Sequence, residues 1–299
     1  MRFSCLCIAL LSGCGRFGFD DVGTIGDANP DVISDAFDLT MPFSTPVALT
    51  SLNNTLADDD PSLTGDLLEI IFDSERMGTS SSDLLVARRA TLADPWSVPA
   101  IITELASVND EDTPCLSRDG LIITLSSDRA GTIGMNDLWT STRTSRTAAW
   151  ATPVRIPELS TVNADDDLSR TADELLGMFT SDRPGGMGGF DIYMTTRAQR
   201  SDPWGTPVLV PELNSTSYDQ DPTIDASGTI LVFSSTRTSD QNLYMATRPD
   251  RSSAFSAPVP ISTLNTNADE SDPWLSPDLR TIVFTRGTDI GRDLYFATR

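Results

Sequence analysis

Residues 204–248 read WGTPVLVPELNSTSYDQDPTIDASGTILVFSSTRTSDQNLYMATR, and the chain contains five copies of this pattern. Each copy opens with an aromatic residue, a small residue, any residue and a proline. The openings begin at intervals of 53, 54, 54 and 51 residues, at Phe43, Trp96, Trp150, Trp204 and Phe255. A unit that recurs with so regular a period is typical of a repeat architecture.

Other positions of the unit keep the same period. Five leucines are each followed six residues later by an acid: Leu52 and Asp58, Leu105 and Glu111, Leu159 and Asp165, Leu213 and Asp219, Leu264 and Glu270. Five Asp or Asn residues are each followed six residues later by arginine: Asp83 and Arg89, Asp137 and Arg143, Asp191 and Arg197, Asn242 and Arg248, Asp293 and Arg299. Every copy of the repeat therefore needs these residues.

Four short strands can be read in one unit. In the fourth unit they are expected at 222–225, 229–234, 242–247 and 255–261, with a turn at Ala226-Ser227-Gly228. Alternating apolar residues and β-branched or aromatic side chains favour strands, and no segment has the length and period of a core helix. Four antiparallel strands repeated around an axis describe a propeller blade.

The order of the signals predicts how the ring closes. The repeat begins with a fourth-strand signal at Phe43 and ends at Arg299, after a third-strand signal. Pairing of residues 43–49 with residues 293–298 would complete the last blade and protect its edge. The predicted fold is thus an all-β, five-bladed β-propeller, residues 43–299, with four antiparallel strands per blade.

The N-terminus predicts export and a lipid anchor. Arg2 precedes a short apolar stretch, which ends in Leu11-Ser12-Gly13-Cys14. This tetrapeptide resembles the lipobox of bacterial lipoproteins, so we expect a signal peptide at residues 1–13, lipidation of Cys14 and a flexible acidic tether at residues 14–42. Gly15 replaces the aspartate that retains some lipoproteins at the inner membrane, which favours the outer membrane of the cell envelope.

Two segments carry a family resemblance. Residues 180–193, TSDRPGGMGGFDIY, and Ser276-Pro277-Asp278 resemble the WD40-like repeats of TolB-type propellers. The resemblance covers about residues 43–299 and implies a propeller of a bacterial envelope protein, often found beside peptidoglycan-binding domains. It carries little information about function, because propellers host many activities.

Composition removes several chemistries. The chain has 21 basic residues, all arginine, 43 acidic residues and no histidine, which gives a net charge of −22. Without histidine or lysine there is no Ser-His or Cys-His pair, no histidine metal site and no P-loop lysine. The negative charge disfavours nucleic acid and anionic membrane surfaces, so we expect membrane contact only through the lipid. Cys115 remains as a lone cysteine after lipidation and cannot form an internal disulfide.

Acids and arginines are expected to alternate on one face, in the crossings between blades and in the loops after the second strands. The candidate binding face consists of Asp58, Asp60, Glu111, Asp165, Asp167, Asp219, Asp221, Glu270, Asp272, Arg76, Arg129, Arg183 and Arg237. The competing interpretation is internal, because arginine forks pair readily with carboxylates and every blade has such a pair. Runs such as Asp165-Asp166-Asp167 also offer calcium ligands, but no EF-hand spacing is present, and we predict no metal site and no cofactor.

The function expected from these features is that of a monomeric, lipid-anchored scaffold that binds an envelope protein, peptidoglycan or another glycan. The alternative is a glycoside hydrolase that works with paired carboxylates, as five-bladed propellers can. Against it, the acids of the five units are nearly equivalent, and no catalytic residue is assigned. Trp96, Trp150 and Trp204 are expected to pack between blades rather than to stack on sugars.

Overall fold

The computed structural model describes residues 39, 41–76, 81–288 and 291–299. The chain divides into two units, Met1–Thr40 and Met41–Arg299. Of the first unit, only Leu39 is among the described residues. The predicted signal peptide, Cys14 and all but three residues of the predicted tether lie outside the described residues. No helix in the described part of the chain is long and apolar enough to span a membrane.

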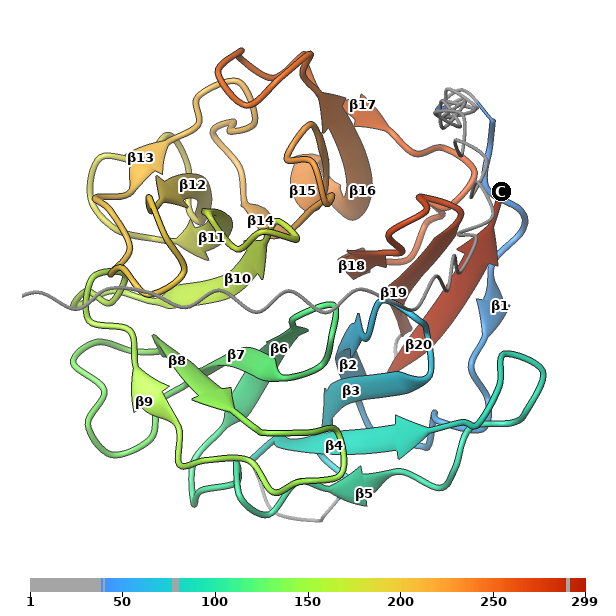
Figure 1. Cartoon of the computed structure of the whole chain (residues 1–299). Helices are drawn as coiled ribbons and strands as arrows, with labels where there is room; N and C mark the ends of the chain where they lie inside the picture. The colour runs from blue at the N-terminus through green and yellow to red at the C-terminus, as the bar shows by residue number, and fades with distance from the viewer. Residues whose placement is uncertain (1–38, 40, 77–80, 289–290) are drawn as a thin grey trace, which may run out of the picture. The chain divides into compact units, whose positions relative to one another are not determined.

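Five four-stranded antiparallel sheets surround a central axis, as predicted (Figure 1). Blade 1 consists of β2 (Asp58–Leu63), β3 (Glu69–Ser74), β4 (Asp83–Arg88) and β5 (Ala100–Ile101). Blade 2 consists of β6 (Glu111–Leu116), β7 (Ile122–Ser127), β8 (Asp137–Thr142) and β9 (Val154–Arg155). Blade 3 consists of β10 (Asp165–Arg170), β11 (Leu176–Ser181), β12 (Asp191–Thr196) and β13 (Val208–Leu209). Blade 4 consists of β14 (Asp219–Ile224), β15 (Ile230–Thr238), β16 (Asp240–Thr247) and β17 (Val259–Pro260).

Blade 5 confirms the predicted closure of the ring. Its strands are β18 (Glu270–Leu275), β19 (Thr281–Thr288), β20 (Gly291–Thr298) and, from the start of the repeat region, β1 (Val47–Ala48). Val47 lies opposite Phe296, and the Leu49 amide donates to the Leu294 carbonyl at 2.8 Å. Figure 1 shows β1 beside β20 at the point where the two ends of the colour scale meet.

The second strand of each blade holds a large apolar side chain in the core. These residues are Phe72, Leu125, Phe179, Phe233 and Phe284, and none is exposed. Neighbouring sheets pack face to face through such residues; one cluster joins Met178 and Ile192 of blade 3 to Phe233 and Tyr244 of blade 4. Each blade therefore buries its apolar faces only against its neighbours, which is why the five units need a closed ring.

Two of the repeat signals meet in every blade. The arginine that ends each unit lies over the aromatic ring that opens the next fourth strand, 4.1–4.3 Å from its centroid. The pairs are Arg89 and Trp96, Arg143 and Trp150, Arg197 and Trp204, Arg248 and Phe255, and Arg299 and Phe43. Cation–π contacts of this kind contribute about 0.5–2 kcal/mol each. Trp204 also packs with Leu138 and Ile156 of blade 2, so it is part of the core between two blades.

The first strand of each blade begins earlier than the sequence pattern indicated: β14 starts at Asp219, three residues before the expected strand. The acidic runs thus lie within strands and not in the crossings between blades. Each first strand contains a β-bulge at its third residue, where the register with the second strand shifts. The bulged residues have left-handed backbones with φ of 47–60°, and they are Asp60, Thr113, Asp167, Asp221 and Asp272.

Candidate functional site

The structure separates the predicted binding face into two groups. The first group contains the acid that opens each first strand and the arginine of the following loop: Asp58 with Arg76, Glu111 with Arg129, Asp165 with Arg183, and Asp219 with Arg237. The same arginines donate to the carbonyl of the buried leucine in the crossing, at Leu52, Leu105, Leu159 and Leu213. We call these arrangements the crossing clamps, since each ties a crossing to the blade that it enters.

A crossing clamp leaves its carboxylate fully occupied. Asp165 accepts hydrogen bonds from Ser181 Oγ at 2.6 Å, from Arg183 Nη2 at 2.5 Å, and from the amide and hydroxyl of Thr161 at 2.6 and 2.8 Å. Its side chain is completely buried. A carboxylate with four donors has no lone pair left for a ligand, so the clamps stabilise the fold and do not form a binding site.

Blade 5 builds its clamp in another way. Glu270 lies opposite Arg286 in the register of β18 and β19, at the place where the other blades have a serine. Arg286 Nε donates to Glu270 Oε1 at 2.8 Å, and its Nη2 donates to the Leu264 carbonyl at 2.7 Å. The arginine therefore replaces both the serine and the later arginine, which explains its position two residues early in the repeat.

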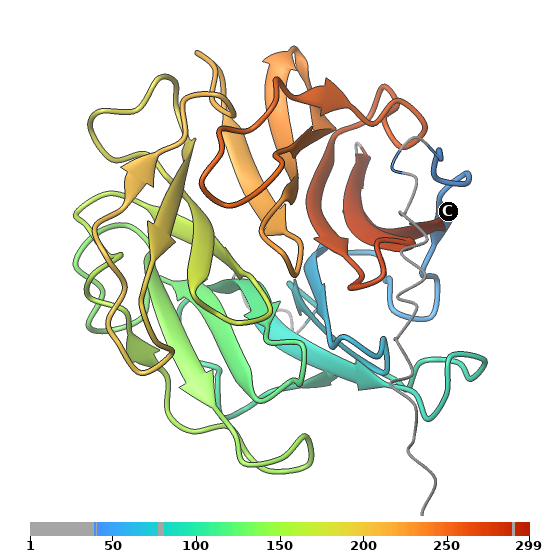
Figure 2. The same ribbon diagram turned by 45° about the horizontal axis from the view of Figure 1, so that its top comes forward.

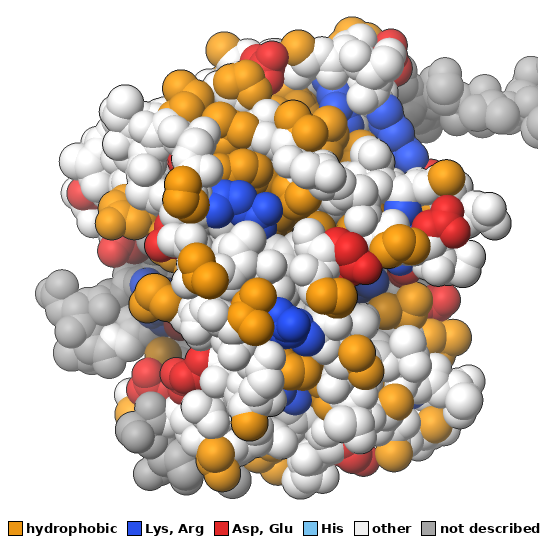
Figure 3. Space-filling view, turned by 90° about the vertical axis from the view of Figure 1, so that its left-hand side faces the viewer, with side chains coloured by type: hydrophobic (Ala, Val, Ile, Leu, Met, Phe, Trp, Pro, Cys, Tyr) orange, Lys and Arg blue, Asp and Glu red, His pale blue; other side chains and the backbone are white. Residues whose placement is uncertain are grey.

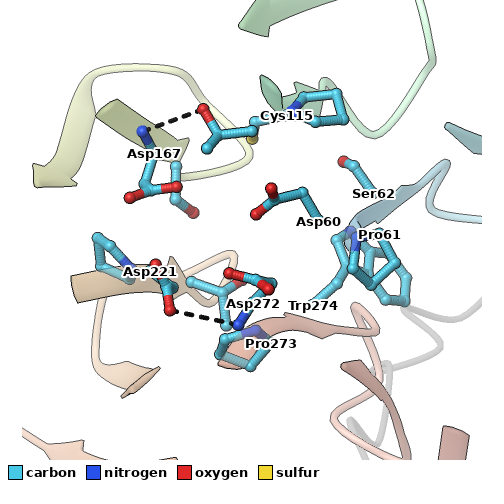
Figure 4. A pocket seen from close by; sticks show the side chains of 14 residues that line it. Asp60, Pro61, Ser62, Cys115, Asp167, Asp221, Asp272, Pro273 and Trp274 are labelled. Carbon is cyan, nitrogen blue, oxygen red and sulfur yellow. Dashed lines mark hydrogen bonds between the residues drawn. The ribbon is translucent and has the colours of Figure 1, made fainter. Parts of the chain in front are cut away.

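The second group of predicted residues surrounds the propeller axis. Asp60, Asp167, Asp221 and Asp272 occupy the bulge positions of four blades, and their side chains converge in the centre (Figure 4). Thr113 occupies the position in blade 2, where its hydroxyl accepts from the Asp167 amide at 3.3 Å. We call these five residues the axial ring. The left-handed bulge turns a strand residue out of its normal alternation, and here it directs acidic side chains toward one another.

A cavity of about 300 Å³ lies on one side of the axial ring. Nine carboxylic acids line this central cavity: Asp59, Asp60, Asp73, Glu75, Asp112, Asp166, Asp167, Asp221 and Asp272. Arg292 is the one basic residue among the described residues that line it. A smaller cavity of about 50 Å³ also touches the ring and is lined by Pro61, Pro114, Pro222 and Pro273.

The predicted binding face lacks six of the charged residues that line the central cavity: Asp59, Asp73, Glu75, Asp112, Asp166 and Arg292. Asp73 lies opposite Asp59 in blade 1. The equivalent residues of the other second strands are hydroxyls, namely Ser126, Thr180, Ser234 and Thr285. Aligning the second strands would have exposed this exception, so the signal was present in the repeat.

The residue just before each third-strand Asp or Asn reaches toward the central cavity or the neighbouring crossing. Ser82 donates to Asp112, Gln241 Nε2 donates to Asp221 at 3.3 Å, and Arg292 Nη1 lies 3.5 Å from Asp59. These donors compensate only part of the acidic charge.

Burial and mutual repulsion raise the pKa of seven acids of the central cavity. Burial, reinforced by neighbouring aspartates, raises the pKa of Asp60, Asp73, Asp167 and Asp221 well above the usual value. Burial also raises the pKa of Asp59 and Asp166 to about 7 and that of Asp112 to about 6. Burial lowers the pKa of Arg292, but the surrounding aspartates outweigh it and the net shift is upward. Between the usual aspartate value and a pKa of about 7, the folded cavity therefore binds more protons than the unfolded chain.

Three oxygens in the central cavity accept no hydrogen bond from any described residue: Asp59 Oδ1, Asp73 Oδ1 and Asp166 Oδ1. Asp59 and Asp73 are only 8% and 6% exposed. Buried carboxylate oxygens without donors are costly, and they mark a place where a ligand can supply the missing interaction. Within the described residues, no three Asp, Glu or Cys side chains are grouped as a metal ion requires.

The acidity of the centre contrasts with the outer side of the blades. On the side of the molecule shown in Figure 3, hydrophobic and arginine side chains alternate with uncharged ones, and acidic side chains form small separate groups. The turned view shows the first strands gathered at the axis and the fourth strands outside (Figure 2). Negative charge is therefore concentrated at the central cavity, on the inner strands.

Comparison with known proteins supports the fold. No protein-family model and no curated protein matches the chain. A putative TolB from Agrobacterium tumefaciens matches with a TM-score of 0.51 and 15% identity, over 81% of this chain and 76% of its own. TolB from Acinetobacter baumannii matches with a TM-score of 0.52 and 17% identity, over 83% of this chain and 56% of its own. An endo-arabinase from Bacteroides thetaiotaomicron matches with a TM-score of 0.60 and 15% identity, over 86% of this chain and 97% of its own. Identities this low show a shared propeller fold and leave the activity open.

Proposed function

We propose that this propeller is a binding module whose central cavity receives a positively charged side chain of a partner protein. The observation that carries the proposal is the lining of the cavity, with nine carboxylic acids against one guanidinium in about 300 Å³. Buried carboxylates are stable when they are protonated, paired with a cation or bound to donors. An entering cation would compete with protons for these carboxylates.

The kind of cation follows from the arrangement of the acids. A guanidinium or ammonium group binds two or three oxygens at a time. Arg292 Nη1 lies 3.5 Å from Asp59 Oδ2, a single contact that leaves the other oxygens to a second cation. The unpartnered oxygens of Asp59 and Asp73 offer acceptors to a second such group. A neutral glycan has no charge to match this lining, so a protein partner is favoured over the glycan partner that the sequence also allowed.

Calorimetric titration with L-argininamide tests this proposal on the purified chain. We expect a Kd of about 1 mM or tighter near pH 7, with proton release that appears as a dependence on the ionisation heat of the buffer. Asp73→Asn should weaken binding about fivefold, the effect of removing one charge pair. Glu212→Gln, which removes an exposed acid outside the cavity, is the matched control and should leave binding unchanged.

Two results would overturn the proposal. One is the absence of any heat or proton release with argininamide. The other is tight calcium binding that excludes argininamide, which would make the cavity a metal site and the calcium interpretation of the acidic runs the better one.

We also propose that the module is held at the outer membrane through a lipid on Cys14, because the first fourteen residues resemble a lipoprotein signal. Incorporation of labelled palmitate should disappear in Cys14→Ser, and the wild-type protein should fractionate with outer membranes. Palmitate labelling that survives this substitution would reject the anchor.

A second candidate function, a glycoside hydrolase, is favoured by one observation. Asp73 is the acid that breaks the symmetry of the five second strands, and burial raises its pKa beside other carboxylates. A protonated acid near an ionised one is what hydrolysis of a glycosidic bond needs. The endo-arabinase likeness suggests linear arabinan, with release of reducing ends as the signal, as the substrate to try. Hydrolysis that Asp73→Asn abolishes and Glu212→Gln preserves would support this function, and no turnover at any pH from 4 to 8 would reject it.

A further inference from the structure

We propose that the partner docks on an apolar surface beside the central cavity, so that its basic side chain is flanked by apolar ones. This inference rests on the proposed function. The surface consists of six side chains that are 45–94% exposed: Val108, Ile133, Met135, Val162, Met187 and Tyr218. We call it the apolar crescent, because it follows three consecutive blades, 2 to 4.

The crescent belongs to the same face as the cavity. Val108, Val162 and Tyr218 lie in the crossings that enter blades 2, 3 and 4, and the other three lie in loops between second and third strands. Residues of the same two kinds of segment line the cavity. Ala57 lies in a crossing, while Asn136 and Phe190 end the loops that carry Met135 and Met187. The aromatic rings of Phe190 and Tyr218 are 6.0 Å apart and connect the cavity wall to the crescent.

The crescent is held in place by backbone contacts between neighbouring blades. The Asp165 amide donates to the Asn136 carbonyl at 3.0 Å, and the Asp219 amide donates to the Phe190 carbonyl at 2.9 Å. At Gly188 an added Cβ would lie 2.1 Å from the Ser217 carbonyl oxygen, so only glycine lets this loop approach the crossing so closely. Because the loops are seated before a partner arrives, little ordering entropy opposes binding.

The exposed valines are specific to the crossings that enter blades 2 and 3. The position of Val108 and Val162 in their crossings is occupied by Thr55, Thr216 and Asn267 in the other three crossings. An exposed valine stabilises nothing in the isolated fold, whereas a group of exposed apolar side chains beside a charged cavity is typical of a protein interface. The repeat alone therefore does not require the crescent.

Charge and shape together define the partner. The acidic cavity selects a guanidinium or ammonium group, and the crescent selects apolar neighbours around it. Met135 and Met187 adapt to irregular apolar surfaces, and tyrosine is enriched among residues that dominate binding energy. The partner chemistry is therefore a basic residue within an apolar segment of another protein.

Three labelled peptides test the inference by fluorescence anisotropy on the full chain. The first has one arginine between leucines, the second has citrulline in place of that arginine, and the third has the arginine between serines. We expect the first peptide to bind at least tenfold more tightly than the other two. The variant Met135→Ser/Val162→Ser should reduce the advantage over the serine-flanked peptide to about threefold or less. It should leave argininamide binding unchanged.

Val259→Ser is the matched control, because Val259 is 59% exposed on an outer strand away from the cavity. Equal affinity for the leucine and serine peptides, or an equal loss in Val259→Ser, would overturn the crescent while argininamide binding could still support the cavity. Failure of argininamide to bind would overturn the proposed function instead. Self-association of the chain in sedimentation, abolished by Met135→Ser, would assign the crescent to a second copy and overturn the proposed partner.

Discussion

The crossing clamps and the axial ring are built from the same short acidic runs, but their acids have different neighbours. In β10, Asp165 and Asp167 are two residues apart. Asp165 is fully buried and bound by four donors, whereas Asp167 faces other carboxylates and has a raised pKa. A normal strand would direct both side chains to the same face, and the bulge at Asp167 separates their environments. The number of donors around an acid, and not its presence in every repeat, therefore decides whether it holds the fold or is available to a ligand.

The largest effect should follow from breaking a clamp. Asp165→Ala leaves the guanidinium of Arg183 and the hydroxyls of Ser181 and Thr161 without their acceptor. Removing one partner of a buried, hydrogen-bonded ion pair costs about 3–5 kcal/mol. Urea denaturation should show that loss in the free energy of unfolding. A loss below about 1 kcal/mol would mean that the clamps do not carry the stability assigned to them.

Stability should also fall as the pH rises from about 4 to 8. The unfolded chain loses protons from its aspartates near the usual value, while Asp59 and Asp166 keep theirs to a pKa of about 7. In that range the folded state binds more protons than the unfolded state, so raising the pH favours unfolding. We expect each of these two groups to contribute a loss of about 2–3 kcal/mol between pH 5 and pH 8, measured by urea denaturation at constant ionic strength. Argininamide should reduce this loss if it replaces the protons.

This contrast also marks what the sequence can and cannot predict. The period of the aromatic and arginine signals was sufficient for the blades and for closure through β1. The division of the acids was not predictable, because nothing in Asp165-Asp166-Asp167 shows where a left-handed bulge falls. Asp73 and Arg292 were within reach, because each departs from its equivalents in the other blades. Positions that the five units share predict the fold, and positions at which one unit differs from the others indicate the candidate site.

Neutralising one acid of the axial ring should raise the free energy of unfolding, whereas breaking a clamp should lower it. Asp167→Asn removes a carboxyl whose pKa is raised by burial, Asp221 and Asp166. At pH 8 the variant should be about 1–2 kcal/mol more stable than the wild type. The reason is that the asparagine, unlike the aspartate, takes up no proton when the chain folds. At pH 5 the two proteins should differ little. Destabilisation at both pH values would show that Asp167 stabilises the fold as the clamp acids do, and the proposed difference between the two groups would be wrong.

The smallest effect should come from completing the axial ring with Thr113→Asp. Thr113 is β-branched and has a left-handed backbone with φ of 47°, which aspartate tolerates better than threonine. Its hydroxyl accepts from the Asp167 amide, and a carboxyl oxygen can take over that role. At pH 5, where a fifth acid would be protonated, relief of backbone strain should stabilise the variant by about 0.5 kcal/mol. At pH 8 repulsion from the other four acids should outweigh this gain, and the variant should be less stable than the wild type by about 1 kcal/mol. The sign of the difference in the free energy of unfolding should therefore reverse between the two pH values. A constant sign would show that local backbone strain, and not charge, governs the bulge positions.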